Sequence, residues 1–174
     1  QTIGIQVAET ILIHSTMSKS DAMARAADVL TRVGLPQEQF PLSRYPHELS
    51  GGQRQRVVIA MAISLRPKLL IADEPTTALD VTTQAQILDL LQDLTRDYDM
   101  GLLMITHDLA VVSDMADKIV VMQLGEVVEQ GKTKSLLTNM QHAYTKMLFA
   151  ASRHQVELPD LPASDVLLSV KNVV

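Results

Sequence analysis

The chain has 174 residues, of which 47% are hydrophobic, so it is long and apolar enough to bury a core and is not a disordered chain. It has no cysteine, a net charge of −5 and 3% aromatic residues. The absence of cysteine excludes disulfides and thiolate metal sites. The negative net charge and the few aromatic residues give no sign of the basic face or the stacking aromatics of a nucleic-acid binder. No apolar run approaches the length of a membrane span.

Apolar periodicity predicts two helices in the first 34 residues, over about 5–14 and 18–33. The second helix has one apolar stripe, formed by Ala22, Ala26, Val29, Leu30 and Val33. Ser18 and Asp21 resemble a capping box in which Asp takes the place of the usual Glu or Gln. We expect Gly34 to end this helix, since Pro36 follows directly beyond it.

The next predicted helix begins at Ser50-Gly51-Gly52-Gln53 and runs to about residue 65. Ser50 is a favourable N-cap, and glycines let a backbone come close to a ligand. The first N–H groups of a helix have no partner within it, and the helix dipole adds positive potential, so phosphate can bind there. The alternative is an ordinary capped helix after a glycine turn, and the pattern alone does not decide.

Two short apolar runs then end in residues that can carry chemistry. Residues 69–72 lead into Asp73 and Glu74, and residues 102–106 lead into His107. We interpret both runs as strands buried on both faces of a parallel sheet, with these three side chains at the edge where ligands bind. Asp73 could hold Mg²⁺, Glu74 could polarise a water and His107 could contact a phosphate. Solvated loop carboxylates and a histidine bonded to local backbone are the alternatives.

Asp80 precedes a helix that begins at Thr82 or Thr83, and by itself it could be a helix cap. Further along, the pattern predicts a helix over about 109–115, strands at 118–122 and 127–130 joined by a hairpin turn, and helices beginning at residue 133 and spanning 143–151. Strands that alternate with helices indicate an α/β fold with a largely parallel sheet. Residues 152–164 are expected to be a linker, and residues 165–174 a further strand.

Four motifs in this order and spacing resemble those of an ABC-type ATPase domain. Residues 49–53 look like its signature motif, residues 69–75 like its Walker B strand, residues 78–80 like its D-loop, and His107 like its switch histidine. Residues 44–47 and 142–145 are similar to the dipeptide and oligopeptide (or glutathione and nickel) importer branch. The resemblance covers roughly residues 1–151. It implies a helical subdomain over residues 1–66 and, over residues 67–151, the C-terminal half of a P-loop NTPase (RecA-like) core with a mainly parallel sheet.

The resemblance also implies roles for single residues. Glu74 would be the catalytic base or water-polarising carboxylate, His107 would contact the γ-phosphate, and Asp73 would hold the metal. The signature residues would bind the γ-phosphate of ATP held by a partner domain, and Asp80 would lie at the seam between the two domains. These signature residues are Ser50, Gly51, Gly52 and Gln53.

At the level of the whole protein, the resemblance implies an ATPase that uses ATP and Mg²⁺ and energises an importer of peptides or similar small solutes. Its partners would be a second ATP-binding domain and transmembrane permease subunits. It would be peripheral, at the cytoplasmic face of the membrane.

The chain departs from the family pattern because it contains no Gly-x-x-x-x-Gly-Lys-Ser/Thr loop, no glutamine loop and no cysteine cluster. We expect both loops upstream of Gln1, and residues 165–174 are similar to the opening strand of a second ATPase domain in a tandem protein. Residues 1–174 alone are therefore expected to bind ATP weakly or not at all, and to be inactive. The alternatives are a soluble ABC ATPase of DNA repair or translation, and a scaffold role with degenerate motifs.

Overall fold

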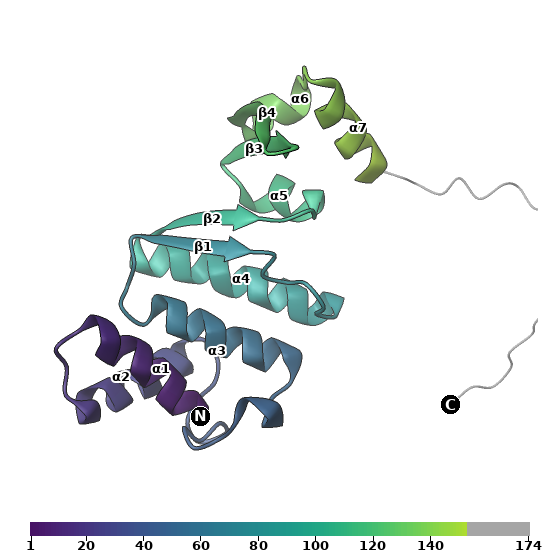
Figure 1. The fold of residues 1–174 in the computed structure, drawn as a ribbon. Helices are drawn as coiled ribbons and strands as arrows, with labels where there is room; N and C mark the ends of the chain where they lie inside the picture. The colour runs from purple at the N-terminus through teal and green to yellow at the C-terminus, as the bar shows by residue number, and fades with distance from the viewer. Residues whose placement is uncertain (153–174) are drawn as a thin grey trace, which may run out of the picture. The chain divides into compact units, whose positions relative to one another are not determined.

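A computed structural model describes residues 1–152 of the chain (Figure 1). The fold divides into two compact units, one over Gln1–Asp108 and one that begins at Leu109. The first unit contains α1 (Ile3–His14), α2 (Lys19–Arg32), a short 3₁₀ helix (Pro46–Glu48), α3 (Gly51–Ile63), β1 (Leu69–Asp73), α4 (Val81–Tyr98) and β2 (Gly101–Ile105). The second unit contains α5 (Leu109–Met115), β3 (Lys118–Gln123), β4 (Glu126–Lys132), α6 (Thr133–Thr138) and α7 (Ala143–Ser152).

The ends of α2 follow the sequence prediction with one correction. Ser18 caps the helix by accepting a hydrogen bond from the Asp21 N–H at 3.1 Å. The Asp21 carboxylate, however, accepts the Ser18 hydroxyl at 2.8 Å and does not return to the Ser18 backbone, so the predicted capping box is not formed. The side chain of Asp21 is shorter than the usual Glu or Gln, and its carboxylate bonds the Ser18 hydroxyl in place of the Ser18 backbone N–H. Gly34 ends the helix in the left-handed region, at φ +80°, as expected.

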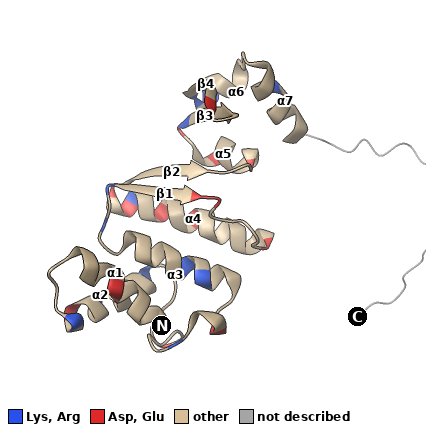
Figure 2. Ribbon diagram, viewed as in Figure 1, with Lys and Arg blue, Asp and Glu red and all other residues tan. Residues whose placement is uncertain are grey.

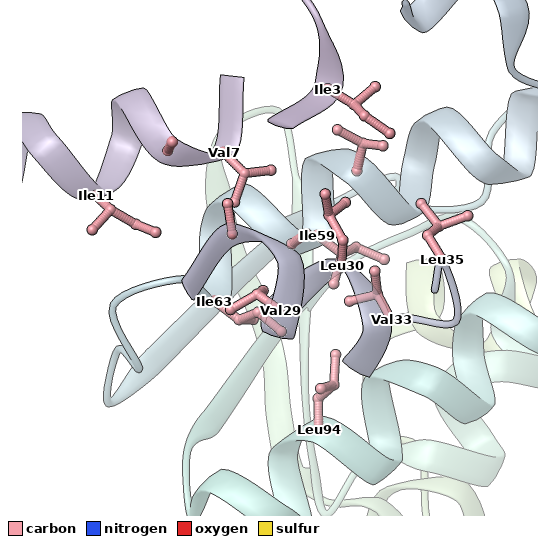
Figure 3. Close-up of a cluster of buried hydrophobic side chains, with 14 of the residues drawn as sticks. Ile3, Val7, Ile11, Val29, Leu30, Val33, Leu35, Ile59, Ile63 and Leu94 are labelled. Atoms are coloured by element: carbon pink, nitrogen blue, oxygen red, sulfur yellow. The ribbon is translucent and has the colours of Figure 1, made fainter. Parts of the chain in front are cut away.

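One apolar core joins the helices of the first unit. Figure 3 shows side chains of α1, α2 and α3 pointing toward one another, with Leu94 of α4 beside them. The predicted stripe of α2 is buried in full, and it packs against α1 and α3. Arg56 of α3 donates to the Val33 carbonyl at 2.7 Å, so α3 also satisfies the C-terminal end of α2.

The strands β1 and β2 form a parallel pair in which Leu69 lies opposite Gly101 and Asp73 opposite Ile105. Leu70, Leu102 and Met104 pack on the core that α4 supplies with Ile87, Leu91 and Leu94. The opposite face is open, with exposures of 49–60% at the following side chains: Leu69, Ile71, Leu103 and Ile105. The prediction of strands buried on both faces was therefore wrong, because the first unit places helices against only one face of this pair.

The second unit is built on an antiparallel hairpin. β3 and β4 are joined by a turn in which Leu124 (φ +52°) and Gly125 (φ +84°) are both left-handed, as a two-residue hairpin of type I′ requires. Glu129 of β4 accepts the N–H groups of Gln141 and His142, at 2.7 and 3.2 Å, and so ties the hairpin to the start of α7. Among residues 1–152 the β1–β2 pair is parallel, as the α/β prediction requires, and the β3–β4 hairpin is a separate antiparallel pair.

The subdomain boundary at residues 66 and 67 falls inside the first compact unit and stays a prediction. The linker from residue 153 onward and the strand over 165–174 lie outside the described residues. None of the helices within residues 1–152 is long and apolar enough to cross a membrane.

Two neighbouring valines of α3 test this packing. Val57 is 4% exposed and Val58 is 55% exposed. Val57→Ala removes buried methyl groups and leaves a cavity, so we expect the free energy of unfolding to fall by about 2 kcal/mol. Val58→Ala is the matched control and should change it by less than about 0.5 kcal/mol. Chemical denaturation measures both, and equal effects would contradict the assigned face of α3.

Candidate functional site

The register of β1 and β2 brings Glu74 and His107 together. Asp73 lies opposite Ile105, and the Glu74 N–H donates to the Ile105 carbonyl at 2.9 Å, which extends the ladder by one bond. The residues just beyond the two strands therefore leave the same edge of the sheet. There His107 Nδ1 lies 2.8 Å from Glu74 Oε1. The sequence predicted a shared edge, and the structure adds that the two side chains are in contact.

This contact changes the acidity of both groups. The hydrogen bond to His107 lowers the pKa of the Glu74 carboxyl below its ordinary value of 4.5, and the same bond raises the pKa of His107 above 6.5. The stabilisation from Glu74 is present above pH 4.5 and is lost as the pH falls through its lowered pKa. The stabilisation from His107 is present below pH 6.5 and is lost as the pH rises through its raised pKa. Both side chains are solvated, at 38% and 82% exposure, so the pair contributes little to stability.

The backbone after β1 turns sharply. Glu74 (φ +48°) and Ala78 (φ +64°) are both in the left-handed region, which is uncommon for residues other than glycine. The Thr77 N–H donates to the Glu74 carbonyl at 3.2 Å, and the Thr77 hydroxyl donates to Glu74 Oε2 at 3.1 Å. Both carboxylate oxygens of Glu74 are therefore held. Left-handed residues of this kind collect at functional sites.

Asp73 closes β1 beside this pair, and Figure 2 shows the acidic segment just after the strand. Its carboxylate is exposed and has no hydrogen bond or ion pair to the described residues. Within residues 1–152 no group of three or more His, Asp or Glu side chains could enclose a metal ion. A protein-only metal cage does not fit this site. A Mg²⁺ that takes one carboxylate from the protein and its other ligands from phosphates and water does fit.

The start of α3 carries the second predicted site. Ser50 Oγ accepts the Gln53 N–H at 3.3 Å, and Gln53 Oε1 accepts the Ser50 N–H at 3.0 Å, which completes a capping box. Both side chains act as acceptors in this box. The Ser50 hydroxyl proton and the Gln53 amide NH₂ remain as donors, and Ser50 and Gly51 are exposed. This arrangement can receive an anion.

Gly52 has a packing role that the sequence analysis missed. A Cβ atom at Gly52 would lie 2.3 Å from Thr83 Cγ2, and Gly52 itself is buried. At Gly51 the nearest atom to such a Cβ is Leu79 Cδ2, at 3.3 Å. The absent side chain of Gly52 thus lets the start of α3 pack against the start of α4. A glycine within the first turn of a predicted helix is the sequence signal that could have indicated close packing at Gly52.

Asp80 is the N-cap of α4, one of the two roles that its sequence allowed. Its Oδ1 accepts the Thr83 N–H at 2.9 Å and its Oδ2 accepts the Thr83 hydroxyl at 2.7 Å. The bond from the Thr83 N–H is the main reason why the pKa of Asp80 is lowered. Since Thr83 also touches Gly52, the predicted signature and D-loop residues belong to one packed group. The residues Asp73, Glu74 and His107 form the other group.

The comparisons with known proteins agree with the predicted family. Residues 2–77 match the family model described as ABC transporter. The chain is 53% identical over 150 residues to the glutathione import ATP-binding protein GsiA of Escherichia coli K12, and to its counterpart in Salmonella choleraesuis. Residues 2–77 belong to the ABC transporter family, and the likeness to GsiA extends over 86% of the chain.

The fold of ABC ATPases is shared as well. A solved structure described as an inward-facing metal-chelate type ABC transporter matches with a TM-score of 0.70 and 31% identity, over 79% of this chain and 54% of that one. The cbiO1 protein of Clostridium perfringens, part of the ABC transporter complex cbiONQ, matches with a TM-score of 0.65 and 28% identity, over 79% and 53%. The GsiA matches cover 86% of this chain, but the chain spans only about a quarter (24%) of the length of those ABC proteins.

A titration of His107 tests the contact in this ABC chain. Glu74→Gln keeps an acceptor oxygen but removes the charge, so the pKa of His107 should fall toward its ordinary value of 6.5. NMR titration of the imidazole C–H signals in residues 1–174 measures it. Glu38→Gln, which removes an exposed carboxylate elsewhere, is the control and should leave the pKa of His107 unchanged. A His107 that titrates identically in Glu74→Gln and in the unaltered chain would show that the pair does not form.

Proposed function

We propose that this chain is part of the ATP-binding and hydrolysing subunit of a membrane ABC importer. The observation that carries this proposal is the Glu74–His107 pair at the edge of the β1–β2 pair, next to an unpaired Asp73. A carboxylate that is ionised near neutral pH and fixed at such an edge can polarise a water for attack on a phosphate. His107 then orients the carboxylate and can turn its exposed ring toward the γ-phosphate.

Asp73 would hold Mg²⁺, which neutralises phosphate charge when it is bound with the nucleotide. Its exposed, unpaired carboxylate supports this role. The chain contributes position and electrostatics to the reaction: Glu74 polarises the water, and His107 keeps the carboxylate at the sheet edge.

The start of α3 would bind a different nucleotide from the one near Glu74. The donors of Ser50 and Gln53 belong to the group that packs on α4 through Gly52 and Thr83, whereas Glu74 and His107 belong to the sheet edge. We infer that Ser50, Gly51, Gly52 and Gln53 contact the γ-phosphate of ATP held by a second ATP-binding domain, with Asp80 near the seam. Each domain would supply half of each site.

The transported solute is proposed from relatives alone. GsiA is named for glutathione import, so a peptide or a similar small solute is the class that we propose here. Transmembrane permease subunits would be the further partners, and the chain would act at the cytoplasmic face of the membrane. A soluble ABC ATPase of DNA repair or translation is less favoured, because relatives that are 53% identical carry an import name.

A single substitution in the whole protein tests the proposed hydrolysis. Glu74→Gln removes the charge that polarises the water but keeps the size of the side chain. We expect ATP turnover to fall by about 100-fold or more, with ATP binding retained. Phosphate release and nucleotide binding measure the two effects, and Glu38→Gln is the matched control. Turnover at the level of the unaltered protein in Glu74→Gln would refute the role of Glu74.

A further inference from the structure

We propose that Thr77 is a positioning residue that fixes the orientation of the Glu74 carboxylate toward the attacking water. This inference rests on the proposed ATP hydrolysis. Its basis is the hydrogen bond from Thr77 Oγ1 to Glu74 Oε2, which complements the contact of His107 with Glu74 Oε1.

The backbone explains why the hydroxyl reaches this oxygen. Residues 74–77 form a β-turn closed by the Thr77 N–H on the Glu74 carbonyl, with Pro75 in its second position, where its fixed φ favours the turn. The side-chain bond joins the same two residues as the backbone bond. Glu74, the first residue of this turn, and Ala78, the residue just after it, are both left-handed. A hydroxyl at position 77 is therefore held near the carboxylate before any ligand binds.

The two hydrogen bonds have different effects on the carboxylate. The terminal torsion of a Glu side chain is broad, so one bond to Oε1 leaves the carboxylate plane free to turn. A second bond to Oε2, from another direction, restricts this rotation. The direction of the lone pair that accepts the water's proton is then defined, and such orientation contributes strongly to rate. His107 alone is a loose restraint, since its side chain is 82% exposed.

Thr77 is itself exposed, so its hydroxyl has little effect on the stability of the fold. Its position differs from that of Thr31, which is also exposed but donates to the Ala27 carbonyl of its own helix at 3.0 Å. Removing either hydroxyl deletes one exposed hydrogen bond. Of these two threonines, Thr77 is the one whose hydroxyl donates to the proposed catalytic carboxylate of Glu74.

The test compares Thr77→Val, Thr77→Ser and the control Thr31→Val in the whole protein. Thr77→Val keeps the shape but loses the donor, so kcat for ATP should fall by roughly 10- to 100-fold while KM stays within about twofold. Thr77→Ser keeps the hydroxyl and should retain kcat within about threefold. Thr31→Val should match the unaltered protein in kcat, and all three variants should melt within a few degrees of it.

The outcomes separate this inference from the proposed function. If Glu74→Gln abolishes turnover and Thr77→Val leaves kcat unchanged, the positioning role is wrong and the proposed function stands. If Thr77→Ser loses as much kcat as Thr77→Val, the hydroxyl is not what matters and the inference is again wrong. If Glu74→Gln keeps full turnover, the proposed function fails and the role of Thr77 fails with it.

Discussion

The register between β1 and β2 is the constraint on which the candidate site depends. Glu74 and His107 are 33 residues apart in sequence, and they meet because Asp73 lies opposite Ile105 in a parallel pair. A shift of one residue would move every side chain of the strand to the other face and separate the pair. The register is set by packing, because Leu70, Leu102 and Met104 must face the core that α4 supplies. Core packing thus determines where the polar edge residues stand.

A second constraint links the two helix starts. The capping box of Ser50 and Gln53 leaves donors at the start of α3, and the cap of α4 is Asp80. Gly52 lets these two starts touch, since Thr83 occupies the space that a side chain would need. The predicted signature and D-loop residues therefore pack together at these two helix starts. This arrangement agrees with two groups that act on different nucleotides.

Local features of the chain could be predicted from its sequence, and long-range ones only in part. The stripe of α2, the Gly34 end and the Ser50 cap follow from periodicity and from residue preferences that operate over one or two turns. The open face of β1 could not be predicted, because an apolar strand looks the same whether one layer or two cover it. The contact of Gly52 with Thr83 joins two helices that are distant in sequence. The contact of Thr77 with Glu74 depends on a turn in which Glu74 is left-handed although it is not a glycine, so the sequence does not mark it.

In the proposed function, Glu74 and Ser50 of one chain serve two different nucleotides. A structure of the whole protein with Mg²⁺ and a non-hydrolysable ATP analogue tests it most directly. We expect one analogue with its γ-phosphate at the Glu74–His107 edge. We expect a second, held by another ATP-binding domain, whose γ-phosphate accepts hydrogen bonds from the Ser50 hydroxyl and the N-terminal N–H groups of α3. A single analogue that contacts both Glu74 and Ser50 of the same chain, or an analogue bound away from both groups, would contradict the account.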